Sequence, residues 1–136
     1  MTIIRLWHHE LIRNGLLPRG QLLSQKRECD LIWKDIANGR KTNHILINYI
    51  WEYEDYLKEL TVYYKLLEKE FIKRGCKFRS SIPITDVDES YIPFSKHQTK
   101  RYLVQCFWNL AEKHDSVQKD FYNELYKKLE KFMEEI

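Results

Sequence analysis

Residues 17–37 read LPRGQLLSQKRECDLIWKDIA, and the apolar pattern of this stretch decides the fold. Apolar and small side chains recur at spacings of three and four, which is the period of a helix with one face against a core. Pro18 and Gly20 come at the start, and Asn38-Gly39 form a favourable stop. We therefore predict one amphipathic helix here. Its core-facing stripe consists of Leu22, Gln25, Cys29, Ile32 and Ile36, widened by Leu23, Trp33 and Ala37.

Glu28 lies at the edge of this stripe, about 40° from Ile32 around the helix axis. A carboxylate at such an edge can border a half-dry cleft, where it would stabilise a nearby cation because attraction between charges grows as water is excluded. The rest of the helix has a basic character, given by Arg19, Lys26, Arg27 and Lys34. The alternative is an ordinary amphipathic helix with solvated charges, since spacing alone establishes no chemistry.

The length and the charge distribution bound the remaining possibilities. A chain of 136 residues is expected to form one domain, residues 1–136, without help from metals or disulfides. A net charge of +3 permits nucleic-acid binding without requiring it. Basic residues gather in Arg19 to Lys41, Lys73 to Arg79 and Lys96 to Arg101, whereas Asp115 to Ile136 holds six acids against four lysines. We therefore expect a polyanion-facing surface that excludes the last helix.

The cysteines and histidines give no sign of a metal centre. Three cysteines, far apart and odd in number, are expected to be reduced thiols in an intracellular protein. His8 and His9 are adjacent and have no carboxylate or cysteine set at ligand spacing, so packing or a hydrogen bond is favoured over metal binding. The N-terminal apolar run is too short for a signal peptide, and no segment approaches transmembrane length. We expect no metal, no cofactor and no membrane partner.

The rest of the chain also reads as helical. Residues 2–17 lack a clear period and are expected to form an extended or briefly turned arm that packs Ile4, Leu6 and Trp7 onto the core. A regular pattern over residues 45–75 predicts the longest helix. Its Tyr and Trp side chains are capable of stacking on bases, although aromatic residues at helical spacing more often belong to a core.

Residues 76–98 contain two prolines and several small polar residues, which predicts a long loop in which Tyr91–Pro93 is the part most firmly held. A third helix is expected from about Thr99. Asp115 to Gln118 has the form of a capping box and predicts the start of a fourth helix that runs to the end. The predicted fold class is all-α: a compact protein of three to four helices with an extended N-terminal arm and a long loop.

Several motifs, in the same order along the chain, resemble the pyrimidine-dimer DNA glycosylase family of the phage endonuclease V type. They are MTIIRLWH, LPRGQLLSQKREC, IANGRK, NHILINY, FIKRG and YIP, which together extend from Thr2 to about Pro93. Arg-Glu in the first predicted helix, Ala-Asn-Gly at its end and Lys-Arg-Gly closing the long helix are the most informative pieces. The resemblance implies a DNA-repair glycosylase with abasic-site lyase activity that acts on damaged double-stranded DNA, expected here to carry a pyrimidine dimer.

The resemblance also implies residue roles. The nucleophile would be the N-terminal amine of Thr2 after loss of Met1, because an α-amine with a pKa of about 7.7–8.0 is partly neutral at cellular pH. Glu28 would stabilise oxocarbenium-like charge at C1′ and then help to remove the 2′ proton. Arg27 would hold the distorted DNA, and Gln21 would face it.

Two family arginines are replaced, by Ile3 and Leu31, and Arg5 is the candidate substitute for the first. These departures leave two alternatives to an enzyme: a noncatalytic damaged-DNA-binding module of the same fold, and a helical interaction protein that uses its aromatic stripes. A monomer is expected. The further candidates for DNA contact, taken from the basic clusters, are Lys26, Lys100 and Arg101.

Overall fold

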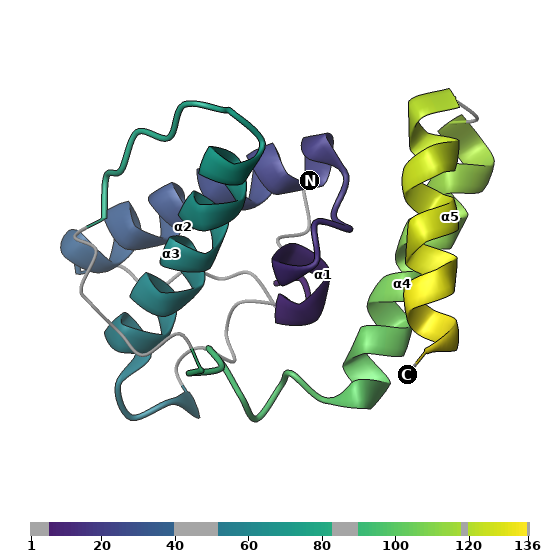
Figure 1. Ribbon diagram of the computed structural model, residues 1–136. Helices are drawn as coiled ribbons and strands as arrows, with labels where there is room; N and C mark the ends of the chain where they lie inside the picture. Colours follow the sequence, from purple (N-terminus) through teal and green to yellow (C-terminus); the bar gives the residue numbers. More distant parts are fainter. Residues whose placement is uncertain (1–5, 40–51, 83–89, 118–119, 136) are drawn as a thin grey trace.

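The computed structural model describes residues 6–39, 52–82, 90–117 and 120–135, and within these ranges all regular structure is helical (Figure 1). This confirms the predicted all-α class. Five helices are present in the described part of the chain, slightly more than predicted. They are α1 (His9–Arg13), α2 (Arg19–Ala37), α3 (Tyr56–Lys73), α4 (Lys100–Val117) and α5 (Asp120–Glu134).

Helix α3 packs against both α1 and α2, whereas α4 and α5 form an antiparallel hairpin beside them (Figure 1). One cluster of buried apolar side chains joins all five helices, and it includes Leu11, Leu22, Leu67, Cys106 and Leu129. None of the described helices is both long and apolar enough to cross a membrane. The hairpin is therefore tied to the other helices through a shared core.

Helix α2 follows the predicted boundaries, beginning after Pro18 and ending before Asn38. Its stripe is confirmed at four positions, since Leu22, Gln25, Cys29 and Ile32 are buried. Trp33 and Ile36 are half-buried against the core. The predicted widening by Leu23 and Ala37 is wrong, because both are exposed. The core thus covers a narrower face of α2 than the pattern of apolar residues indicates.

The predicted start of the long helix is wrong. Glu52 to Asp55 form turns, and Asp55 caps α3 by accepting a hydrogen bond from the Lys58 amide at 3.2 Å. Aspartate is favoured at this position because its short carboxylate accepts hydrogen bonds from the first backbone amides, which have no partner within the helix. The part of the predicted helix before residue 52 lies outside the described residues. At 18 residues α3 is also shorter than the 19 residues of α2, so it is not the longest described helix.

The N-terminal arm contains α1, a helix of five residues. Its predicted packing is confirmed for Leu6 and Trp7, which are buried, whereas Ile4 lies outside the described residues. Gly15 follows α1 with φ +66°, a left-handed conformation that glycine adopts without strain. This turn reverses the chain, so that α2 begins close to α3.

The predicted loop is confirmed in its described parts, and Tyr91–Pro93 is firmly held. Arg13 Nη2 donates to the Tyr91 carbonyl at 3.0 Å. The Tyr91 hydroxyl donates to Glu59 of α3, and the other oxygen of this buried carboxylate accepts from the Phe94 amide at 2.8 Å. The predicted capping box is wrong: α4 continues through Asp115 to Val117, and α5 begins at Asp120.

Candidate functional site

Glu28 is half-buried on α2, next to the fully buried Cys29 and one turn after the buried Gln25. Burial raises the pKa of the Cys29 thiol well above its usual range, and the nearby carboxylates of Asp30 and Glu28 add to this effect. A thiol in that environment stays protonated and is a poor nucleophile. Cys29 therefore belongs to the core, whereas the half-buried carboxylate of Glu28 borders solvent.

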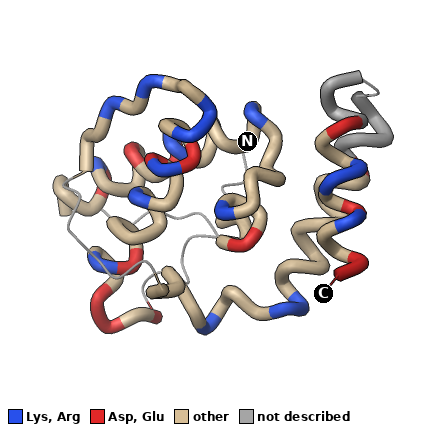
Figure 2. Tube along the Cα trace, viewed as in Figure 1, with Lys and Arg blue, Asp and Glu red and all other residues tan. Residues whose placement is uncertain are grey.

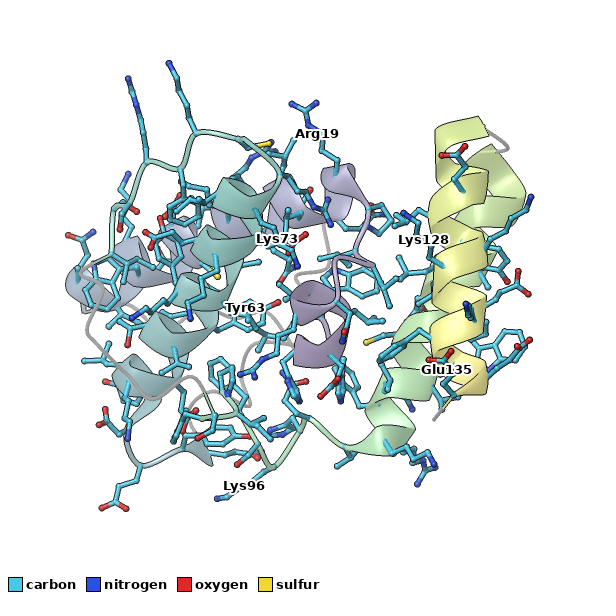
Figure 3. All side chains as sticks on the ribbon, in the orientation of Figure 1. Arg19, Tyr63, Lys73, Lys96, Lys128 and Glu135 are labelled. Atoms are coloured by element: carbon cyan, nitrogen blue, oxygen red, sulfur yellow. The ribbon has the colours of Figure 1, made fainter. Side chains whose placement is uncertain are left out.

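The N-terminal segment is attached to α2 at the turn before Glu28. The Tyr63 hydroxyl of α3 accepts a hydrogen bond from the Trp7 amide at 3.1 Å and donates one to Gln25 Oε1 at 2.7 Å. Tyr63 is completely buried and lies in the centre of the molecule between α3 and α1 (Figure 3). Two hydrogen bonds thus link the backbone at Trp7 to a side chain three residues before Glu28.

Thr2 and Arg5, the predicted nucleophile and one of the predicted DNA contacts, lie outside the described residues. Of the predicted contacts on α2, Arg27 is exposed and Gln21 is half-buried. Lys100 and Arg101 are exposed in the first turn of α4.

Lys26, also predicted to contact DNA, has structural partners. Its Nζ lies 2.8 Å from Asp30 Oδ2 and 5.0 Å from the centre of the Phe78 ring. Burial alone would raise the pKa of Asp30, but hydrogen bonds from Lys26, Ser81 and Tyr64 outweigh it and lower that pKa. This network joins α2 to α3 and to the segment that follows α3.

The structure groups two of the three basic clusters and separates the third. Arg74 Nη2 donates to the Leu17 carbonyl at 2.7 Å, which brings the cluster after α3 next to the start of α2. Figure 2 shows basic residues along the segment after α3, at the upper edge, and others at the lower edge where α4 begins. Arg19 and Lys96, labelled in Figure 3, mark these two edges. Lys100 and Arg101 therefore lie apart from Arg27 and its neighbours on α2.

The adjacent histidines serve in packing, as predicted. His8 and His9 are 3% and 4% exposed, with their ring centres 4.7 Å apart, and His8 Nδ1 accepts from the Glu10 amide at 3.2 Å. Burial, with the neighbouring His8 ring, lowers the pKa of His9 to about 4. In the described ranges, no group of three His, Cys, Asp or Glu side chains is placed to hold a metal ion.

The apolar pattern of the sequence does not reveal the hydroxyl groups that organise this region. Helical spacing assigns the tyrosines of α3 to the core, and the rings of Tyr63 and Tyr64 are indeed buried, whereas Tyr56 is half-buried. A buried tyrosine requires a hydrogen-bond partner that a phenylalanine does not, so tyrosine at a core position is the signal that was available. The partners themselves, Gln25 and the Trp7 amide, follow only from the packing of α1 and α2 on α3.

Comparison with protein families gives a match. The model of a family described as pyrimidine dimer DNA glycosylase matches residues 1–83, which is more than half of the 136 residues. This confirms the resemblance found in the motifs, although Tyr91–Pro93 lie beyond the matched residues. Comparison with curated proteins and with solved structures gave no match. The matched range includes Thr2 and Glu28 and ends before α4, and it supports a repair enzyme that acts on DNA.

Proposed function

The chain belongs to the pyrimidine dimer DNA glycosylase family, and on that basis we propose that it both excises a damaged base and cleaves the DNA strand at the resulting abasic site. The nucleophile is the α-amine of Thr2, exposed by removal of Met1. The substrate is double-stranded DNA that carries a lesion, most naturally a pyrimidine dimer given the family. We further propose that the enzyme acts as a monomer, inside the compartment that holds the genome.

The position of Trp7 carries this proposal. Thr2 is five positions before Trp7 in the chain, and five residues of extended chain span at most about 17 Å. The Trp7 amide is two hydrogen bonds away from Gln25, and Glu28 lies about 4.5 Å further along the axis of α2. The reach of the N-terminal amine therefore includes the surroundings of the Glu28 carboxylate.

The chemistry suits these two groups. A neutral α-amine attacks C1′ of the damaged nucleotide, the base leaves with the bonding electron pair, and opening of the sugar ring gives an imine between protein and C1′. The Glu28 carboxylate stabilises positive charge at C1′ in the first step because the group is half-buried. It then accepts the 2′ proton, and β-elimination breaks the bond between C3′ and the phosphate oxygen. Hydrolysis of the imine restores the amine.

Borohydride trapping tests the proposal, because hydride reduces the imine to a stable amine and leaves a covalent complex. The wild-type protein should be trapped on dimer-containing DNA and on preformed abasic-site DNA. Glu28→Gln should still be trapped on the abasic site, where the amine alone forms the imine, but its strand cleavage should fall by about 10²–10⁴-fold.

Asp35→Asn is the matched control, because Asp35 is half-buried on the same side of α2, seven residues after Glu28. It should cleave at the wild-type rate. An equal loss in both variants would assign the effect to α2 as a whole and remove Glu28 from the mechanism. Lack of any trapped complex with protein shown to begin at Thr2 would refute the enzyme.

A noncatalytic damaged-DNA-binding module is the second candidate, motivated by Ile3 and Leu31 at positions where the family often has arginine. Leu31 is 49% exposed on α2, so this position offers DNA an apolar contact in place of a charge. Such a module would bind lesion-containing DNA with an affinity that falls steeply with salt, and it would give neither trapping nor cleavage.

A further inference from the structure

Two tyrosine hydroxyls bind opposite sides of a single peptide group. The Leu6–Trp7 peptide presents the Leu6 carbonyl and the Trp7 amide. The Tyr102 hydroxyl of α4 donates to the Leu6 carbonyl, and the Tyr63 hydroxyl of α3 accepts from the Trp7 amide at 3.1 Å. Both polar groups of this peptide are therefore satisfied by side chains from two different helices.

Each tyrosine is itself fixed. Tyr63 is completely buried, and its hydroxyl proton goes to Gln25 of α2 at 2.7 Å. Tyr102 is half-buried in the first turn of α4, and its ring centre lies 6.5 Å from that of His8. The amide of the next residue, His9, donates to Gln98 Oε1 at 3.1 Å. The peptide is thus held against α2, α3 and α4, together with the segment that leads into α4.

We infer that Tyr63, Gln25 and Tyr102 are positioning residues that hold the Leu6–Trp7 peptide and so set where the N-terminal amine can reach. This inference rests on the proposed function, in which Thr2 is the nucleophile. Thr2 is only four positions before Leu6 in the chain, so displacement of this peptide displaces the point from which the amine approaches Glu28. Misplacing a reacting group by about 1 Å can cost about 10²-fold in rate.

The C-terminal hairpin thereby takes part in catalysis through Tyr102. The family match ends at residue 83, before Tyr102, so one side of the peptide is held by a helix outside the matched range. The other side is held by Tyr63 and Gln25 within it. The hairpin should therefore contribute to the rate of imine formation even where its residues do not contact the DNA.

The experiment compares Tyr63→Phe and Tyr102→Phe with wild type, since each substitution removes one hydroxyl and keeps the ring. The rate of borohydride trapping is measured on preformed abasic-site DNA in a single turnover, with protein well above its Kd. Each variant should be trapped about 10-fold more slowly, with Kd for the same DNA within about twofold of wild type, because positioning affects the reaction and not the binding. Tyr102 is less buried than Tyr63, so Tyr102→Phe still tests the inference if Tyr63→Phe fails to fold.

Tyr64→Phe is the matched control. Tyr64 is also completely buried on α3, and its hydroxyl donates to Asp30 of α2 at 2.8 Å, but the Leu6–Trp7 peptide is held by other residues. This variant should lose stability comparably and be trapped at the wild-type rate. Slower trapping in all three variants would show that the slower reaction comes from a general loss of stability, and it would overturn the inference.

A readout independent of chemistry separates the inference from the proposed function. Hydrogen exchange of the Trp7 amide should accelerate in Tyr63→Phe and stay slow in Tyr64→Phe. If wild type is trapped and Tyr63→Phe and Tyr102→Phe are trapped equally fast, the positioning role is wrong while the proposed function stands. If wild type is not trapped at all, the proposed function fails, whereas faster exchange of the Trp7 amide in Tyr63→Phe would still show that this hydroxyl holds the Leu6–Trp7 peptide.

Discussion

Acidification should destabilise the fold through His9. This side chain is 4% exposed, and its pKa is lowered from 6.5 to about 4 by burial first and the neighbouring His8 second. The unfolded chain therefore binds a proton more readily than the folded one between these two values. The stability associated with neutral His9 is fully present above about pH 6.5 and is lost as the pH falls toward 4.

The magnitude follows from the two pKa values. Between pH 8 and pH 5 the difference in proton binding lowers the free energy of unfolding by about 2 kcal/mol, and the full shift corresponds to about 3 kcal/mol. Free energies of unfolding of single domains are about 5–15 kcal/mol. The protein should therefore stay folded at pH 5 without denaturant, but unfold there at a lower urea concentration than at pH 8. The partner His8 also has a pKa lowered by burial, and it adds a loss of the same sign.

Urea unfolding at pH 8, 7, 6 and 5 measures this loss. The comparison is His9→Gln, which keeps a polar side chain and cannot take up the proton. The free energy of unfolding of the variant should fall less between pH 8 and pH 5 than that of wild type, by about 2 kcal/mol. The reasoning would be refuted if the free energy of unfolding of the two proteins changed equally with pH, or if His9 titrated near pH 6.5 in NMR spectra.

Further predictions concern the loop, the turns and the basic surface. Glu59→Ala removes a buried carboxylate that accepts a hydrogen bond from the Phe94 amide. It should lower the free energy of unfolding in urea by about 2–4 kcal/mol, a larger loss than in the control Glu54→Ala, where the side chain is exposed. Gly15→Ala should lower the melting temperature more than Gly39→Ala. Both glycines have positive φ, but of the two only Gly15 would bring the new Cβ close to a carboxylate oxygen, at 3.3 Å. Equal melting temperatures of the two variants would contradict this prediction. Arg27→Gln should weaken DNA binding similarly for damaged and undamaged duplexes and reduce the salt slope by about one; an unchanged slope would place this exposed side chain off the DNA.

The sequence predicts elements well where turn chemistry and apolar period agree. Helix α2 begins after Pro18 and ends before Asn38 as expected, because proline and Asn-Gly act locally. The start of α3 was misplaced because the helical period continues backward through Glu52 to Asp55, and the capping role of Asp55 is hidden within it. Periodicity describes which residues face a core, but it does not reveal which of several compatible residues caps the helix.

The candidate functional site is only partly predictable from the sequence. The motifs identify the family and select Glu28, and the structure places that residue half-buried at a core edge as its spacing indicates. The roles of Tyr63 and Tyr102 were beyond reach, because they bind backbone groups of residues 56 and 96 positions away in sequence. Charge alone predicts that Lys26 contacts DNA, whereas its contact with Asp30 and Phe78 depends on the path of the segment after α3.

The central claim concerns which nitrogen forms the bond to DNA, and mass spectrometry of the trapped complex tests it directly. After borohydride reduction on abasic-site DNA and proteolysis, the sugar adduct should lie on the N-terminal peptide, at the α-amine of Thr2. An adduct on an internal lysine, or a trapped complex formed equally well by protein that retains Met1, would contradict the account.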